Sequence, residues 1–239
     1  DAKLYDAVET VGMELCPALG IAVPVGKDSM SMRTVWEEDG EEKSVTSPLS
    51  LIVTAFAPVD DARLSLTPEL QHEADSILLL IDLGFGQNRL GASALAQVYG
   101  AIGNEAPDLE DPAKLRGFFD AIQRLLREQR LLAYHDRSDG GLAATIAEMA
   151  FAGGTGVNLE LESLSGSTLG KLFNEELGAV VQIRAEDRDT VFSTFIEFGL
   201  QDALHEIGGL RDDDRVTIVE GGHLVFDSSR AALRRDWSE

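Results

Sequence analysis

The chain has 239 residues, of which 44% are hydrophobic and 26% charged, a composition typical of one large globular domain or two smaller ones. Its formal net charge of −22 argues against nucleic acid and anionic membranes as partners. No apolar run approaches the roughly 18 residues that cross a bilayer. The single cysteine, Cys16, excludes a disulfide within the chain and fits a reducing cytoplasm. We interpret it as a small buried side chain, because a nucleophile needs a base nearby.

The first quarter of the chain predicts a helix, a hairpin and a strand. Apolar residues recur in steps of four, three and four between Leu4 and Leu15, which predicts a helix over residues 1–19 that Gly20 ends. The acidic segment 36–47 predicts a solvated hairpin loop. The apolar, β-branched segment 49–56 predicts a strand.

Strands and helices alternate after residues 64–68, where the character of the sequence changes and we place a domain boundary. The predicted strands are residues 77–83, 131–134, 157–161, 179–183, 216–219 and 224–226. The predicted helices are residues 112–130, 141–152 and 186–198 and a terminal segment. This order predicts a layered α/β to α+β fold, with helices packed on a sheet.

A polar turn at residues 24–32 is the first candidate site. Gly26 lets a backbone approach a ligand closely, and Lys27 supplies a point charge for phosphate. The spacing is not that of a P-loop. From the residues alone, a binding turn and an ordinary polar turn both stay open.

The second candidate is the segment 135–141, at a predicted junction between a strand and a helix. Ser138 or Asp139 can cap the helix, and the unpaired backbone N–H groups at the N-terminus of that helix attract anions. Asp136 and Asp139 would repel a phosphate unless a divalent cation such as Mg²⁺, held by Asp136, lay between them. The alternative is that Asp139 merely caps the helix and Asp136 is a solvated turn residue.

Other polar segments carry weaker signals. Residues 84–91 contain three glycines, but their spacing does not fit a dinucleotide fingerprint, so a strand-to-helix turn is the better interpretation. The four histidines are scattered without the spacing of zinc ligands. Glu175 and Glu176 are adjacent, point to different helical faces, and form no ready-made pair.

Four segments together resemble a known family. They are GKDSMSM at 26–32, TSPLSL at 46–51, HDRSDGGL at 135–142 and LFNEELG at 172–178. In this order and spacing they resemble the second half of the synthetase region of the large, single-chain phosphoribosylformylglycinamidine synthases. The resemblance covers essentially the whole chain. It implies a C-terminal domain like that of aminoimidazole ribonucleotide synthetase at residues 67–239, preceded at residues 1–66 by the tail of the paired N-terminal domain.

The resemblance also implies a reaction. In this family ATP activates the amide oxygen of formylglycinamide ribonucleotide as a phosphate ester, and ammonia from a glutaminase domain displaces the phosphate to give the amidine. We therefore expect a cytoplasmic ATP-dependent ligase of purine biosynthesis, a glutamine amidotransferase with ATP or ADP and Mg²⁺ as cofactors. Its partners would be the small-molecule substrate and the rest of the same polypeptide, with no nucleic acid and no membrane.

Site residues follow from the resemblance position by position. Asp136 would bind Mg²⁺, and Ser138, with Gly140 and Gly141, would bind a nucleotide at a second, structural site. The substrate and phosphate contacts at the reacting site would come from Gly26, Lys27, Asp28, Ser29 and Ser31. No catalytic residue is assigned. The chain begins inside a predicted helix without an initiator methionine. The resemblance implies that the family's other Mg²⁺ ligands lie before this chain and its glutaminase residues after it. We therefore expect no activity from this chain alone.

Three other functions are compatible with parts of the sequence. A selenophosphate-synthetase-like or hydrogenase-maturation protein of the same superfamily would also use ATP, but should lack the 26–31 stretch. A non-catalytic nucleotide-binding domain of the superfamily would hold the ligand to stiffen the fold. An acidic interaction domain without a ligand would require the four ordered motifs to be coincidental.

Overall fold

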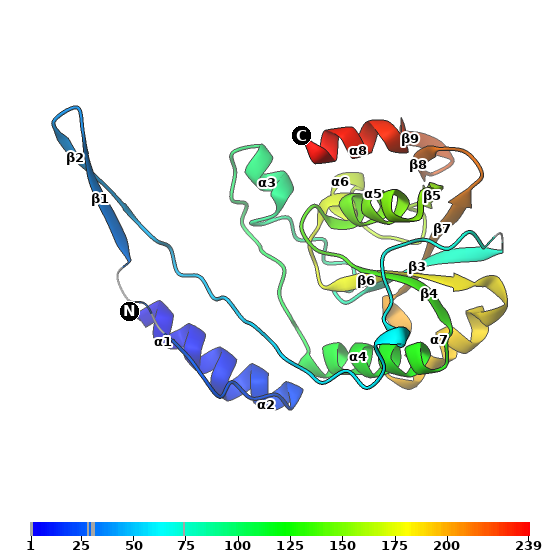
Figure 1. The fold of residues 1–239 in the computed structure, drawn as a ribbon, viewed down its shortest axis with the longest axis horizontal. Coiled ribbons are helices and arrows are strands. Elements are labelled where there is room, and N and C mark those ends of the chain that lie inside the picture. Colours follow the sequence, from blue (N-terminus) through cyan, green and yellow to red (C-terminus); the bar gives the residue numbers. More distant parts are fainter. Residues whose placement is uncertain (1, 28, 30–31, 74) are drawn as a thin grey trace. The chain divides into compact units, whose positions relative to one another are not determined.

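The structure is a computed structural model that describes residues 2–27, 29, 32–73 and 75–239. The chain divides into two compact units, Asp1–Asp60 and Asp61–Glu239 (Figure 1). Each unit is described by itself. The identity of the two expected domains, residues 1–66 and 67–239, stays a prediction.

The first unit begins with one continuous helical segment. It comprises α1 (Ala2–Glu9), a π-helical stretch (Thr10–Leu15) and α2 (Cys16–Leu19). Gly20 ends it in the left-handed conformation with φ 73°, where a glycine has no Cβ to strain. The predicted helix and its end are therefore confirmed, and Cys16 is buried as expected.

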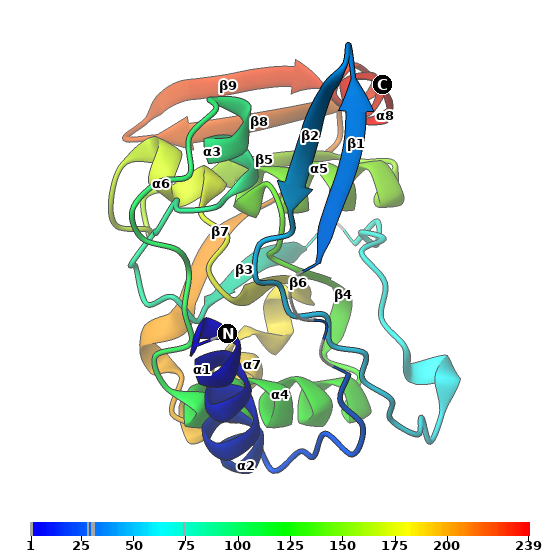
Figure 2. The same cartoon turned by 90° about the vertical axis from the view of Figure 1, so that its left-hand side faces the viewer.

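A hairpin follows, drawn in blue in Figure 2. β1 (Arg33–Glu38) pairs antiparallel with β2 (Glu41–Thr46). Asp39 and Gly40 form the two-residue turn with φ of 57° and 79°, as an Asp-Gly hairpin turn requires. The predicted hairpin is confirmed, and its acidic arms form strands rather than a loop.

The predicted strand at residues 49–56 is wrong. This segment is extended but belongs to no sheet among the described residues, and its apolar side chains are exposed, Ile52 to 91% and Phe56 to 92%. A β-branched apolar run becomes a strand only when a neighbouring strand completes its hydrogen bonds. No described strand of this unit pairs with it.

The second unit is built on a mixed seven-stranded sheet in the order β4-β6-β3-β7-β5-β8-β9. The strands are β3 (Ser76–Asp82), β4 (Leu131–Asp136), β5 (Gly156–Glu160), β6 (Gly178–Arg184), β7 (Leu204–Arg211), β8 (Arg215–Glu220) and β9 (His223–Ser229). Neighbouring strands run antiparallel except for β5 and β8, which are parallel.

Helices cover both faces of this sheet. They are α3 (Ala94–Val98), α4 (Pro112–Arg127), α5 (Gly141–Gly153), α6 (Thr168–Phe173), α7 (Arg188–Glu197) and α8 (Arg230–Ser238). Helices α4 and α7 lie on one face, and α5, α6 and α8 on the other (Figure 1). Successive residues of β3 point to opposite faces, so Leu78 and Leu80 join the core under α5 while Leu79 and Ile81 join the core over α4. The predicted layered α/β to α+β fold is confirmed.

The sequence did not predict β7, α3 or α6. Strand β7 contains Gly208 and Gly209, and Gly208 has φ 129° where the pairing with β3 shifts register. Glycines of this kind weaken the strand signal and mark bulges.

Within the described residues, no helix has the length and apolar content needed to cross a membrane.

Candidate functional site

The segment between β4 and α5 carries the candidate nucleotide site. Strand β4 ends at Asp136 and α5 begins at Gly141. Gly140 and Gly141 both have positive φ, 80° and 65°, which only glycine adopts without strain. A Cβ on Gly141 would lie 2.6 Å from the backbone oxygen of Asn174. The second glycine is therefore required by the close approach of α5 to the segment after α6.

The expected cap of α5 by Ser138 or Asp139 is wrong. Gly140 is the N-cap residue and no side chain of its own caps the helix. The Glu175 carboxylate takes this role from a distant part of the chain, because its Oε1 accepts the N–H of Gly140 at 2.8 Å. The same oxygen accepts the N–H of Ala94, at the start of α3, also at 2.8 Å. One partly buried carboxylate thus accepts backbone N–H groups at the beginnings of two helices.

This capping determines which groups of the motif are available to a ligand. The Gly140 N–H is engaged by Glu175, and the Gly141 N–H donates to the Ser138 carbonyl at 2.9 Å. The side chains of Ser138 and Asp139 are exposed, and no described residue forms a hydrogen bond with either. These two backbone N–H groups therefore already have partners, whereas the side chains of Ser138 and Asp139 face solvent.

Arg137 anchors the motif to the sheet. Its side chain is 1% exposed, and Nη2 lies 2.6 Å from Oδ1 of Asp82 at the end of β3. Its Nε donates to the carbonyl of Glu176 at 2.7 Å, and Nη2 also donates to that of Leu177. Charged hydrogen bonds are strong when buried and fully satisfied. Arg137 thus has a structural role, because it fixes the motif to the end of β3 and to the segment before β6.

Glu176 forms a second buried ion pair. Its side chain is fully buried, and it accepts the guanidinium of Arg89 on both oxygens, at 2.7 and 2.8 Å. This hydrogen bonding raises the pKa of Arg89 above its ordinary value. Glu175 and Glu176 have different partners, as expected, but they project from an extended segment after α6 rather than from a helix.

The glycine-containing segment 84–91 is the connection from β3 towards α3, as interpreted from the sequence. The carboxylate of Asp82 accepts the N–H of Gly84 at 3.1 Å and that of Gly86 at 2.8 Å. The amides that a phosphate loop would present are therefore directed at the chain's own carboxylate.

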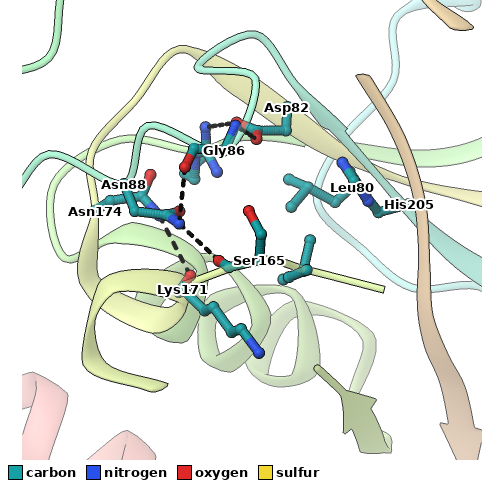
Figure 3. Close-up of a pocket in the computed structure, with 10 residues that line it drawn as sticks. Leu80, Asp82, Gly86, Asn88, Ser165, Lys171, Asn174 and His205 are labelled. Carbon is teal, nitrogen blue, oxygen red and sulfur yellow. Dashed lines mark hydrogen bonds and ion pairs between the residues drawn. The ribbon is translucent and has the colours of Figure 1, made fainter. Parts of the chain in front are cut away.

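Beneath these loops lies a small cavity of about 20 Å³ (Figure 3). Asp82, Asn88, Ser165, Lys171 and Asn174 line it. A cavity of this size holds about one water molecule. It is therefore part of the interior packing, and a nucleotide does not fit in it.

At the end of β4, Asp136 presents an exposed carboxylate whose Oδ1 accepts the hydroxyl of Tyr134 at 2.5 Å. Burial, together with this carboxylate, raises the pKa of Tyr134 well above its ordinary value, so the phenol remains a donor. His135 Nε2 lies 2.8 Å from a carboxylate oxygen of Glu148 on α5. The other oxygen of Glu148 accepts the indole N–H of Trp237 on α8 at 2.9 Å.

The donor set suits a metal ion shared with a ligand better than a protein-only metal site. Nowhere in the described ranges do three His, Cys, Asp or Glu side chains gather in a metal-binding arrangement. Mg²⁺ commonly takes only one or two carboxylates and completes its shell with phosphate oxygens and water. The exposed carboxylate of Asp136 fits that kind of binding.

The second candidate, in the first unit, is an exposed turn. Gly26, Lys27 and Ser29 are all exposed, and Lys27 Nζ donates to Ser29 Oγ at 2.7 Å. Asp28 and Ser31, predicted to bind substrate or phosphate, lie outside the described residues. The turn therefore presents a cation and a hydroxyl close together.

The structure joins this turn to another of the motifs. The Ser47 N–H donates to the Met32 carbonyl at 2.9 Å, so the 26–32 and 46–51 segments meet at the base of the hairpin. A groove of about 460 Å³ is lined there by residues 32–34 and 45–48. Met32 from the first motif and Thr46, Ser47 and Pro48 from the second thus border one concave surface within the first unit.

Two domain families match the chain. Residues 1–58 match the FGAR-AT PurM_N-like domain, and residues 73–221, more than half of the chain, match the AIR synthase related protein, C-terminal domain. The chain belongs to the AIR synthase related protein family. The family resemblance inferred from the four motifs is confirmed by these matches.

Solved structures with a similar fold include two complexes of one bacterial protein. Thermotoga maritima PurL in complex with FGAR is 11% identical, with a TM-score of 0.61, over 80% of this chain and 30% of that one. The ATP complex of T. maritima PurL is 10% identical, with a TM-score of 0.58, over 80% of this chain and 28% of that one. At this identity the likeness establishes the fold. The chain spans less than a third of the length of these proteins.

Proposed function

We propose that this chain is part of an ATP-dependent amidotransferase that converts formylglycinamide ribonucleotide to the amidine in purine biosynthesis. Within that enzyme, it contributes contacts to a Mg²⁺-bound nucleotide and to the substrate. The observation that carries the proposal is the arrangement at the end of β4, where Asp136, Ser138 and Asp139 are exposed while Arg137 and Glu175 hold the backbone. The PurL structures of similar fold with ATP, ADP and FGAR support these ligand classes.

The nucleotide site takes its ligands from exposed side chains. Asp136 would hold Mg²⁺ through a carboxylate oxygen, so that a phosphate could lie near the acids without repulsion. The Ser138 hydroxyl contacts the nucleotide directly. Gly140 and Gly141 shape the turn, since their amides already have partners. When bound, Mg²⁺ supplies charge to stabilise phosphate oxygens.

The substrate site uses the turn of the first unit. Lys27 and Ser29 offer a cation and a hydroxyl 2.7 Å apart. Together with Gly26, Asp28 and Ser31, they are proposed to contact the substrate or the transferred phosphate. An enzyme of this kind works in the cytoplasm with a glutaminase domain as its ammonia source.

A second candidate function is a nucleotide-holding domain that does not turn the ligand over. It is favoured by the contact of Glu175 with the Gly140 N–H, because a carboxylate at the start of α5 would repel a reacting phosphate placed there. A ligand held only by Asp136 and Ser138 would stiffen the β4–α5 junction. The two functions agree on the binding residues and differ in whether turnover occurs.

The test is calorimetric titration of the 239-residue chain with Mg·ADP. We expect binding by the native chain, loss of binding in Asp136→Ala, and at most a small change in Asp139→Ala, a neighbouring exposed acid. Absence of binding by the native chain, or equal binding by Asp136→Ala, would contradict the proposed site.

With ATP, formylglycinamide ribonucleotide and ammonia, we expect no amidine above background from this chain alone. Measured turnover would overturn that part of the proposal.

A further inference from the structure

Tyr134 is held rigidly beside the proposed metal ligand. It lies two residues before Asp136 in β4, so both side chains are on the same side of the strand. Its backbone N–H donates to the Thr67 carbonyl at 3.0 Å. Its ring packs against the core cluster formed with α4 and α7. The position of the phenol is therefore set by the body of the second unit.

The hydroxyl of this fixed ring reaches the exposed carboxylate. It donates to Oδ1 of Asp136 at 2.5 Å, and this is the only hydrogen bond that a described residue makes with the Asp136 side chain. No described residue forms a hydrogen bond with Oδ2, and Asp136 as a whole is exposed. An exposed carboxylate on its own would rotate freely, at an entropic cost to any ligand that must order it.

We propose that Tyr134 is a positioning residue, which orients the Asp136 carboxylate so that Oδ2 is presented to the Mg²⁺ of a bound nucleotide. This inference rests on the proposed function. Groups that hydrogen-bond a metal ligand from behind fix its orientation, and their removal typically costs about 10- to 100-fold in metal affinity. The hydroxyl, rather than the ring, carries the effect.

The test compares two variants that remove one hydroxyl each. Tyr134→Phe keeps the packed ring and removes the contact to Asp136. Tyr99→Phe makes the same chemical change at a tyrosine that is 79% exposed after α3. The dissociation constant of the 239-residue chain is measured by calorimetry for Mg·ADP, and for ADP with EDTA. We expect Tyr134→Phe to weaken Mg·ADP binding about tenfold, with metal-free ADP binding unchanged, and Tyr99→Phe to change neither.

The metal dependence separates positioning from a general structural role. If Tyr134→Phe weakened ADP equally with and without Mg²⁺, or left Mg·ADP binding within twofold of the native value, the inference would be refuted. A further check adds Tyr134→Phe to Asp136→Asn, where no additional loss is expected because the pair no longer acts on the metal. An additional tenfold loss there would also refute it.

The same titrations distinguish this inference from the function on which it rests. If the native chain binds Mg·ADP and Asp136→Ala does not, but Tyr134→Phe binds normally, the metal site stands and the role of Tyr134 fails. If the native chain does not bind, the proposed site fails and the role of Tyr134 fails with it.

Discussion

The buried pair of Arg137 and Asp82 gives a stability prediction that can be worked out from its contacts. The side chains are 1% and 6% exposed, and the guanidinium makes three hydrogen bonds, one to the Asp82 carboxylate and two to the backbone carbonyls of Glu176 and Leu177. In Arg137→Met, the Asp82 carboxylate stays buried with only two backbone amides as donors. Breaking one side of a buried pair costs about 3–5 kcal/mol.

The assay is urea unfolding followed by tryptophan fluorescence. The chain has two tryptophans, Trp36 in the first unit and Trp237 in the second. In a Trp36→Phe background, the emission therefore reports on the second unit, where the Trp237 indole contacts Glu148 and Phe151. With a urea dependence of about 2 kcal/mol per molar, a loss of about 4 kcal/mol lowers the midpoint by about 2 M.

The matched control is Arg63→Met, which removes an arginine whose side chain is 89% exposed and which pairs with Asp61 close by in sequence. We expect no measurable shift, because solvent screens such pairs. Replacing both members of the buried pair, in Asp82→Asn with Arg137→Met, should cost less than the sum of the single changes. A midpoint shift below about 0.5 M in Arg137→Met would refute the reasoning that this pair fixes the motif.

Two further predictions concern stability. Gly141→Ala should destabilise the second unit by more than Gly154→Ala, because both glycines have positive φ, of 65° and 64°, but only the first has a neighbour, the Asn174 oxygen, within 2.6 Å of the added Cβ. Equal losses in thermal melting would contradict this. Lys171 holds the pKa of the Glu220 carboxyl below its ordinary 4.5, so its stabilising contribution is present above pH 4.5 and is lost as the pH falls through the lower folded pKa. The difference in melting temperature between native chain and Glu220→Gln should therefore disappear in acid, and a difference that persisted at pH 2 would contradict this.

Local signals in the sequence predicted the regular elements well. The apolar period of the first helix and the glycine after it gave both the helix and its end, and the buried run at 77–83 gave the central strand. The failures occurred where a segment depends on a partner. Residues 49–56 have the composition of a strand but no described neighbour, and β7 forms despite its two glycines because β3 and β5 flank it.

The candidate site could be predicted only in part, because its support comes from residues distant in sequence. The HDRSDGG segment was identified, but its capping by Glu175 joins positions 35 residues apart. The pair of Arg89 and Glu176 joins positions 87 apart. Neither a hydrophobic period nor a short motif encodes such distances. The adjacency of two acids in LFNEELG was visible, whereas their partners required the fold.

These contacts explain why one short motif contains both buried and exposed charges. Arg137 and Glu175 make the hydrogen bonds that hold the turn in place. The side chains of Asp136, Ser138 and Asp139 are therefore not needed to hold the turn, and they are exposed. A polar side chain that neither caps a helix nor pairs across the sheet is available to a ligand, and here three such side chains follow one strand. Only Asp136 is further restrained, by a hydroxyl from the core. That asymmetry favours Asp136 over Asp139 as the proposed metal ligand, and comparing Asp136→Ala with Asp139→Ala separates ligand binding from an effect of surface charge.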